Sequence, residues 1–577
     1  MQNLSGSLPP VPPGHAPTSA AEQDAAIATL RAASERWRAA TLAEQVELLE
    51  ALIPTVMAAS EGWVAAGCAL KGVQRGAHAE TEEWLGGPYT VLRGVRQLVR
   101  SLKDLADRGA PQLPGVAKAL PNGQVAAPVF PADPLDRILL RGITAEVWLD
   151  PEVTLDGVPE SMAGGQRPAS RRARVALVLG AGNVTSIGPM DVLHKLFSEG
   201  ECVVLKLNPV NEAVGPALTE ALRPLIDADV LRIMYGGAEV GDRLCQHDGI
   251  DSIHVTGSLS THDRVVWGEG TEAADRKRAG TPRNTRPVTS ELGNVSPVIV
   301  IPGPWSKGDL RYHGENLASS LTTNAGFNCN ATRVMLTHAG WSQRDDLLAA
   351  VREALGDTEV RPAYYPGQQA QRDAFLVAHP DATRVGEGEA PWLLAEGLDP
   401  SERLDPCFQH EFWCGAMGEA PLPAEDTAEF IRKAVRLANE VISGSLNVTV
   451  LVHPLSMRDP VIGRAVERAI SDLRFGTVAV NLWAAASFPL GSTTWGAFPG
   501  GSLDDAGSGI GTVHNTFLFD RPQKTVLRAP FRVFPRPAWF TRNSSGPAVG
   551  RHLTSLTARP TLGRLLRVLL AAVGLGR

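Results

Sequence analysis

The sequence predicts an α/β protein with two doubly wound parallel-sheet domains. From residue 173 onward, short apolar runs such as ARVALVLGAG and CVVLKLNP alternate with helical stretches, a pattern typical of parallel strands joined by helices. A second alternation runs from about 291 to 515 and includes SPVIVIPG, VTVLVHP and GTVAVNLW. The length of 577 residues exceeds what one hydrophobic core usually supports, so we expect at least two domains.

Composition excludes several classes of protein. With 44% hydrophobic and 20% charged residues and a net charge of -7, the chain is neither disordered nor a typical nucleic-acid binder. Six scattered cysteines show no CxxC pair or Cys/His spacing, so we expect no metal site, no disulfide scaffold and a reducing, cytoplasmic location. The first twenty residues lack the pattern of a secretory signal, and no uninterrupted apolar run is long enough to predict a membrane span.

The remaining segments are interpreted in chain order. Apolar residues at helical spacing predict helices over 22–107, after a flexible lead-in over 1–21. Residues 108–135 are rich in Pro, Gly and Ala and resemble a connector, whereas 137–149 has the composition of a β segment. We further expect an exposed insertion over 263–288 and a late strand at KTVLRAPF, residues 524–531.

Parallel sheets bind ligands beyond the carboxyl ends of their strands, so the residues that follow each strand are candidates for chemistry. These are Asn183, Lys206 and Thr256. The turn GAGNVTSIG contains Gly180 and Gly182, but Thr185 stands where a dinucleotide-binding fingerprint needs its third glycine. Taken alone, this segment therefore favours an ordinary tight turn between a strand and a helix.

Two further residues are ambiguous when considered singly. Cys329, in TTNAGFNCNATRV, is either an inert core thiol or a nucleophile, and a nucleophile needs activation and a proton acceptor nearby. Glu291, in TSELGNVSP, is either that acceptor or a solvated carboxylate at the end of a strand.

The order of the motifs adds information that no single motif carries. Seven short motifs follow one another with compatible spacing between residues 25 and 530: GAGN, VVLKLNP, HVTGS, SELGN, NAGFNC, HEFWCG and KTV. In this ordered set the chain resembles the aldehyde dehydrogenase superfamily. The resemblance implies an aldehyde-dehydrogenase-like fold that adds a small β oligomerisation segment to the two domains.

The resemblance also implies a role for each matched residue. Cys329 is expected to be the thiolate nucleophile, Asn183 to stabilise the oxyanion with the Cys329 backbone N–H, and Glu291 to activate water. The coenzyme, NAD or NADP, is expected to contact Lys206, Thr256, Gly257, Ser258 and Glu411. The expected product is a carboxylic acid, formed through a thioester.

A division of the chain follows from the same resemblance. It assigns residues 22–136 and 156–290 to a coenzyme-binding domain and 291–515 to a catalytic domain. Residues 137–155 and 516–532 are expected to pair between subunits of a homodimer or homotetramer and cover an exposed sheet edge.

Departures from the family pattern leave alternatives open. Pro209 replaces the glutamate that binds the ribose in NAD-preferring members, which predicts weak discrimination between NAD and NADP. If NAD is preferred, Glu212 is the expected compensating group. Phe327 replaces the usual glutamine beside the nucleophile. A CoA-acylating dehydrogenase or acyl-CoA reductase is one alternative function, and a catalytically silent scaffold is another. The aldehyde is not identified, although the segment expected to line its tunnel contains Trp483, Phe488 and Trp495.

The tail over 533–577 lies beyond the resemblance. Residues 521–577 contain ten Arg, one Lys and no acidic residue, a formal charge of +11, so the other 520 residues carry -18. Within TLGRLLRVLLAAVGLGR, one helical stripe contains Leu562, Leu565, Leu566, Leu569 and Val573. Such a basic amphipathic helix either docks on the acidic body of the oligomer or makes peripheral contact with an anionic membrane.

Overall fold

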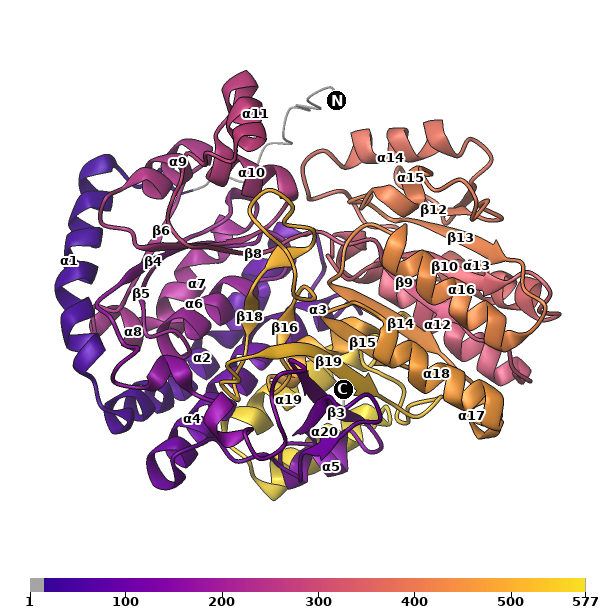
Figure 1. Cartoon of the computed structure of the whole chain (residues 1–577), viewed down its shortest axis with the longest axis horizontal. Coiled ribbons are helices and arrows are strands. Elements are labelled where there is room, and N and C mark those ends of the chain that lie inside the picture. Colours follow the sequence, from indigo (N-terminus) through magenta and orange to yellow (C-terminus); the bar gives the residue numbers. More distant parts are fainter. Residues whose placement is uncertain (1–14, 576–577) are drawn as a thin grey trace.

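The computed structural model describes residues 15–575, so most of the predicted lead-in lies outside the described residues. Two large sheets organise this part of the chain, and the predicted fold class is confirmed (Figure 1). In the view of Figure 1, the first sheet lies in the left half of the molecule and most of the second lies in the right half, with β16 (Trp495–Gly496) and β18 (Thr512–His514) between them.

The first sheet has the order β17-β8-β7-β4-β5-β6. Five strands are parallel, and the short β17 pairs antiparallel with β8. The order changes direction at β4, because β5 and β6 lie on one side of it and β7 and β8 on the other, and ligands bind at such a switch point. The strands are β4 (Val175–Leu179), β5 (Cys202–Lys206), β6 (Leu231–Met234), β7 (Ser252–Thr256), β8 (Val288–Glu291) and β17 (Gly509–Ile510).

Helices cover both faces of this sheet (Figure 1). Ser19 and Thr41 each form a capping box at the start of a helix, which fixes where the first two helices begin. The helices are α1 (Ala20–Ala39), α2 (Leu42–Leu70), α3 (Glu80–Trp84), α4 (Thr90–Arg108), α6 (Ile187–Phe197), α7 (Gly215–Ala221), α8 (Arg223–Asp227), α9 (Ala238–Gln246), α10 (Leu259–Trp267) and α11 (Gly270–Ala279).

Among the described helices, α2 alone has the length and mean hydropathy that a membrane span needs. It instead packs against α4 and α7 and buries Leu49, Leu52, Val56 and Trp63 completely. The segment predicted as an exposed insertion, 263–288, contains the end of α10 and all of α11, and α11 has no buried residue.

The second sheet has eleven strands in the order β1-β2-β3-β19-β15-β14-β9-β10-β13-β12-β11. Neighbouring strands from β19 to β12 are parallel, and the strands outside them pair antiparallel. The strands are β1 (Lys118–Ala119), β2 (Val125–Phe130), β3 (Thr144–Leu149), β9 (Ser296–Val300), β10 (Thr332–His338), β11 (Thr383–Val385), β12 (Trp392–Ala395), β13 (Ala416–Leu422), β14 (Asn447–Leu451), β15 (Thr477–Val480) and β19 (Pro522–Arg528).

The helices of this half lie mainly between strands β9 and β15 in the chain. They are α12 (Lys307–Thr322), α13 (Arg344–Gly356), α14 (Gln368–Ala378), α15 (Pro406–Gln409), α16 (Thr427–Glu440), α17 (Pro454–Arg458) and α18 (Pro460–Asp472). Short 3-10 turns at Thr323–Gly326 and Ala484–Leu490 shape the loops nearest the first sheet.

Two predictions about the segment before residue 150 were wrong. The supposed connector contains β2, which is almost entirely buried and belongs to the second sheet. The expected β segment over 137–149 begins as a helix, α5 (Pro134–Leu139), because Asp133 caps it with a capping box to Asp136 and Pro134 occupies its first turn. The second part of that segment, Thr144–Leu149, forms the expected strand, β3.

The strands that were expected to pair between subunits also have partners within this chain. Strand β19 pairs parallel with β15 along Thr477–Val480, and β3 pairs antiparallel with β19. Their pairing between subunits stays a prediction.

The predicted tail forms two helices, α19 (Gly546–Ala558) and α20 (Leu562–Ala572), after an irregular stretch. Helix α19 packs on α3, and α20 packs on α19. The tail therefore docks on the body of its own chain, as one of the two sequence interpretations expected, although the body is that of the same subunit.

Candidate active site

A cavity of about 610 Å³ lies beyond the carboxyl ends of β4, β5, β7 and β8. All eight residues that the sequence analysis assigned to catalysis or coenzyme binding line it: Asn183, Lys206, Thr256, Gly257, Ser258, Glu291, Cys329 and Glu411. Three of them are the last residues of their strands, since β5, β7 and β8 end at Lys206, Thr256 and Glu291. The topology of the first sheet therefore brings together residues that are far apart in the sequence.

Cys329 lies at the end of a backbone segment with unusual torsion angles. Asn324, Ala325 and Gly326 have φ values of 59°, 56° and 83°, the left-handed region that residues with a side chain rarely adopt. A Cβ atom on Gly326 would lie 2.8 Å from the Cys414 carbonyl oxygen. Strained backbone of this kind persists only where the surrounding contacts hold it in place. Here it shapes the loop over residues 323–329, the nucleophile loop, which presents the Cys329 thiol to the cavity.

The thiol of Cys329 and the carboxylate of Glu291 form a direct pair. The thiol donates to Glu291 Oε1 at 3.1 Å, and Glu291 is 2% exposed. Burial raises the pKa of Glu291, and burial together with the nearby Glu291 charge raises the pKa of Cys329 well above its usual value. The pair thus holds one proton that the carboxylate can accept when the thiol reacts.

Asn183 is held by the nucleophile loop on one side and by the amino-terminal helices on the other. Its side-chain amide donates to the Phe327 carbonyl at 3.0 Å. The backbone carbonyl of Asn183 accepts from Lys71 Nζ at 2.8 Å and from Asn324 Nδ2 at 2.9 Å. Lys71 also forms a buried ion pair of 2.6 Å with Glu83. The sequence analysis missed Lys71, which stands at the end of a long helix with no motif around it.

A buried polar group behind the cavity was also missed. Asp191, on α6, accepts from Thr256 Oγ1 at 3.2 Å and lies 3.0 Å from His514 Nε2. Burial lowers the pKa of the neighbouring His254 to about 4 and therefore keeps that ring neutral. The one sequence signal was a single aspartate inside the apolar run IGPMDVL, which is too weak to interpret without the strand that carries His514.

The opposite end of the cavity fits an anionic dinucleotide. Ser258 caps α10, whose amino terminus faces the cavity, and helix amino termini bind phosphate groups. Glu411 Oε1 is buried without a hydrogen-bond partner among the described residues, and burial raises the pKa of Glu411 to about 7. Gly293 leaves the room for this carboxyl, because a Cβ there would lie 2.0 Å from Glu411 Oε2. A ribose hydroxyl would satisfy the orphaned oxygen.

Lys206 and Pro209 flank the same end of the cavity. Burial lowers the pKa of Lys206 to about 8, with a partial opposing effect of Glu212. Glu212, named above as a residue that could compensate for Pro209, does not line the cavity. Its Oε1 accepts from the Gly236 N–H at 2.5 Å instead.

A second cavity of about 110 Å³ shares the nucleophile loop. Asn324 and Asn328 line it together with Trp483, Phe488 and, from the tail, Trp539. Of the three aromatic residues expected in a substrate tunnel, Trp495 does not line this cavity but packs with Leu446 and Val513 near Cys329. Trp539 was not anticipated because it lies outside the segment of the resemblance.

Phe327, which replaces the usual glutamine, is completely buried. Its ring packs against the rings of Tyr364, Tyr365 and Trp413 at centroid distances of 5.0 to 6.3 Å. The substitution is therefore accommodated by an aromatic cluster beneath the nucleophile loop.

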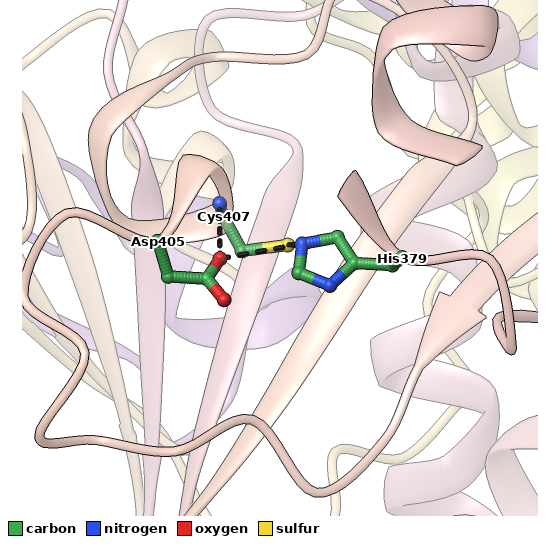
Figure 2. Close-up of side chains that lie close together, drawn as sticks. All are labelled: His379, Asp405 and Cys407. Atoms are coloured by element: carbon green, nitrogen blue, oxygen red, sulfur yellow. Dashed lines mark hydrogen bonds and ion pairs between the residues drawn. The ribbon is translucent and has the colours of Figure 1, made fainter. Parts of the chain in front are cut away.

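Another cluster of titratable side chains lies apart from both cavities (Figure 2). His379 Nε2 lies 3.3 Å from Cys407 Sγ and 3.3 Å from Asp405 Oδ1, which also accepts from the Cys407 backbone N–H at 2.8 Å. These atom types also bind zinc, and they lie within 4.8 Å of one another. Because hydrogen bonds within the cluster already pair these groups, the arrangement is explained as a link between the end of α14 and the start of α15.

Comparison with known proteins gives similarities in sequence and in fold. A sequence model of the aldehyde dehydrogenase family matches residues 183–369. The chain is 30% identical over 177 residues to N-succinylglutamate 5-semialdehyde dehydrogenase of Sphingopyxis alaskensis, covering 30% of this chain and 33% of the relative. It is 24% identical over 237 residues to 4-trimethylaminobutyraldehyde dehydrogenase A of Danio rerio, covering 40% and 42%. The matched region thus spans between a third and about two fifths of the length of these relatives.

Solved structures share the fold over most of the chain. The aldehyde dehydrogenase of Mycobacterium tuberculosis complexed with NAD+ has a TM-score of 0.60 at 18% identity, covering 88% of this chain and 90% of that one. The NADP-dependent glyceraldehyde-3-phosphate dehydrogenase of Bacillus halodurans complexed with NADP has a TM-score of 0.58 at 17% identity, covering 88% and 91%. Residues 183–369 therefore match the aldehyde dehydrogenase family in sequence, and most of the chain shares the fold of solved aldehyde dehydrogenases.

Proposed function

We propose that this protein oxidises an aldehyde to a carboxylic acid with NAD or NADP, through a thioester on Cys329. The contact of 3.1 Å between Cys329 Sγ and Glu291 Oε1, at the carboxyl end of the first sheet, carries the proposal. Relatives of this chain include semialdehyde and aldehyde dehydrogenases, and two similar structures hold NAD+ or NADP. The chemistry needs a reduced thiol, so we place the protein in a reducing compartment such as the cytoplasm.

In the proposed reaction, Glu291 accepts the thiol proton and the Cys329 sulfur attacks the aldehyde carbon. The Asn183 amide and the Cys329 backbone N–H stabilise the oxyanion that forms. When bound, the nicotinamide coenzyme supplies the hydride acceptor. Glu291 passes the thiol proton to solvent, and the ionised carboxylate then takes a proton from water, whose oxygen attacks the thioester carbon. The Cys329 sulfur leaves and receives the proton held by Glu291 as the acid is released.

Coenzyme binding is proposed to involve residues that line the same cavity as Glu411. Ser258 and the amino terminus of α10 would bind the pyrophosphate, and Lys206 and Glu411 would each bind a ribose. Pro209 neither repels a 2′-phosphate nor accepts from a 2′-hydroxyl, and Glu212 is directed away from the cavity. We therefore expect less than about a hundredfold preference between NAD and NADP, equivalent to roughly 2.7 kcal/mol.

An absorbance assay tests the proposal directly. Purified protein, a panel of aliphatic and aromatic aldehydes, and either NAD or NADP should give reduced coenzyme without any further cofactor. Cys329→Ala should give none while still binding coenzyme, since the other thiol that lines the cavity, Cys245, is buried and burial raises its pKa to about 12. Full turnover of this variant would refute the mechanism.

Addition of CoA separates the two enzymatic alternatives. If CoA releases the thioester, the rate should depend on CoA and the product should be an acyl-CoA. The buried contact of Glu291 with the thiol favours water as the acceptor. Absence of reduced coenzyme under both conditions, across the panel and with both coenzymes, would favour a silent scaffold.

A further inference from the structure

Helix α20 presents a continuous apolar face to the outside of the molecule. The residues on this face, with their exposed fractions, are Leu562 (72%), Leu566 (50%), Leu569 (37%), Leu570 (49%) and Val573 (51%), followed by Leu575 (65%) just past the helix. Positions 562, 566, 569, 570 and 573 follow the spacing of a single helical face. Each of the other described helices carries at most one large apolar side chain that is exposed.

The apolar face is not a sign of a poorly packed helix. Val568 and Ala571, on the opposite side, are buried against α19. Helix α19 is in turn anchored on the body, because Gly550 lets its backbone approach Trp84, and the Arg551 guanidinium lies 5.4 Å from the centre of that ring and 3.0 Å from Glu61. The fold therefore holds α20 in a fixed position with its leucines directed outward.

The arginines of residues 521–577 divide into two groups. Six pair with carboxylates of the body: Arg521, Arg528, Arg532, Arg536, Arg542 and Arg551. Within residues 15–575, Arg559, Arg564 and Arg567 have no carboxylate within 4.0 Å, and all three lie on or just before α20. Most of the positive charge of the tail is thus neutralised by docking. The Arg564 guanidinium faces α19, where it donates to Ser555 Oγ at 2.9 Å and to the Arg559 carbonyl at 3.1 Å, whereas Arg559 and Arg567 are exposed.

This combination determines which partner the face suits. A second copy has no other helix with such a face among the described residues, so self-association would place α20 against α20, with the exposed Arg567 of each copy on the helix that makes the contact. An anionic bilayer satisfies both features, because apolar side chains enter the acyl boundary and arginines contact the headgroups. The helix has 11 residues, so it is too short to span the bilayer.

We propose that α20 is a membrane-docking helix that lies in the surface of an anionic bilayer and holds the enzyme there peripherally. The inference does not depend on the proposed reaction, since α20 contributes no residue to either cavity.

Co-sedimentation of the full chain with vesicles tests this proposal. Vesicles of phosphatidylcholine with about a third phosphatidylglycerol should bind the protein, and pure phosphatidylcholine should bind it several-fold less. The double variant Leu566→Glu/Leu570→Glu should lose about tenfold or more in partitioning, because two charges replace side chains expected to enter the bilayer. Arg567→Gln should reduce the dependence on anionic lipid and on salt.

Matched controls keep the result interpretable. Leu455→Glu/Val461→Glu makes the same change of charge at side chains that are 53% and 58% exposed on α17 and α18, and should bind vesicles like the unaltered protein. Circular dichroism checks that each variant is folded. Equal binding by both double variants, or no binding by the unaltered protein, would overturn the proposal. Light scattering that shows Leu566→Glu/Leu570→Glu dissociating a dimer would identify the face as a self-association surface instead.

Discussion

At the scale of single residues, the two acids of the cavity differ in what they face. Glu291 meets the nucleophile, whereas one oxygen of Glu411 has no partner among the described residues. Both carboxyls have a raised pKa because burial disfavours their charged forms. A protonated Glu291 cannot act as a base, so the rate of the proposed hydrolysis should rise with pH until this carboxyl is ionised.

Replacement of Glu291 by glutamine separates the two halves of the reaction. Glu291→Gln keeps the shape of the side chain but removes the base of both steps. Water can still take the thiol proton, so the thioester should form more slowly and then persist because its hydrolysis lacks a base. We expect a burst of up to one reduced coenzyme per site, followed by a steady rate about 10² to 10⁴ times lower. Rapid mixing with quantified active sites measures both phases. Steady turnover at the original rate would show that Glu291 is not the base.

Lys206 predicts a pH dependence for coenzyme binding. Burial lowers its pKa to about 8 from a free value near 10.4. Burying the charged form therefore costs stability that is fully lost below about pH 8 and is regained as pH rises from about 8 towards the free value. Loss of the proton should weaken its proposed contact with the coenzyme. We expect the coenzyme KM to rise above about pH 8 at constant ionic strength.

Two variants of Lys206 provide the control for this profile. Lys206→Arg keeps its charge over this range and should flatten the rise in KM. Lys206→Met should give a high KM that no longer changes between pH 7 and pH 9. An unchanged profile in the methionine variant would assign the pH dependence to another group.

The ordered motifs allowed eight cavity residues to be proposed from sequence because each lies in a short local pattern. Lys71, Asp191 and His514 have no such pattern. Asp191 and His514 are separated by 323 positions and meet only because β18 packs against α6. Pairings of this kind follow from tertiary structure and leave no periodic signal in the chain.

At the scale of elements, the nucleophile loop depends on one glycine. In Gly326→Ala, the new Cβ would meet the Cys414 carbonyl oxygen at 2.8 Å, in a backbone that already has a φ of 83°. Displacement of the loop should misplace the Cys329 thiol, and we expect kcat to fall by about 10² with the chain still folded. Gly280→Ala, at φ 65° with open space around it, is the control for the backbone effect alone and should keep its activity.

Secondary structure was harder to predict where an apolar run typical of a strand lay beside a proline or a helix-capping residue. Strand β2 (VAAPVF) was taken for a connector because Pro128 interrupts it. The strand tolerates this proline close to the edge of the sheet, where only the two residues of β1 lie beyond it. Conversely, the apolar residues of RILL suggested a strand, although the DPLD sequence just before them is a helix cap.

At the scale of the whole molecule, the pairing of β19 with β15 makes the second sheet complete within one chain. Stability should therefore not depend on assembly. We expect the midpoint of thermal unfolding to stay constant over a hundredfold dilution, which differential scanning fluorimetry can measure. If these strands paired between subunits, the midpoint would fall with dilution.

The same sheet has a consequence for synthesis. Thr144 pairs with Arg528, which is 384 positions further along the chain, so β3 is made long before its partner exists. At translation rates of about 5 to 20 residues per second, β3 waits roughly 20 to 80 s for β19. Throughout that interval the nascent chain has an open strand edge to which a neighbouring chain can pair. Folding on the ribosome should therefore be vulnerable to aggregation in this window, and we expect chaperone depletion to lower the yield of this protein during synthesis rather than after it.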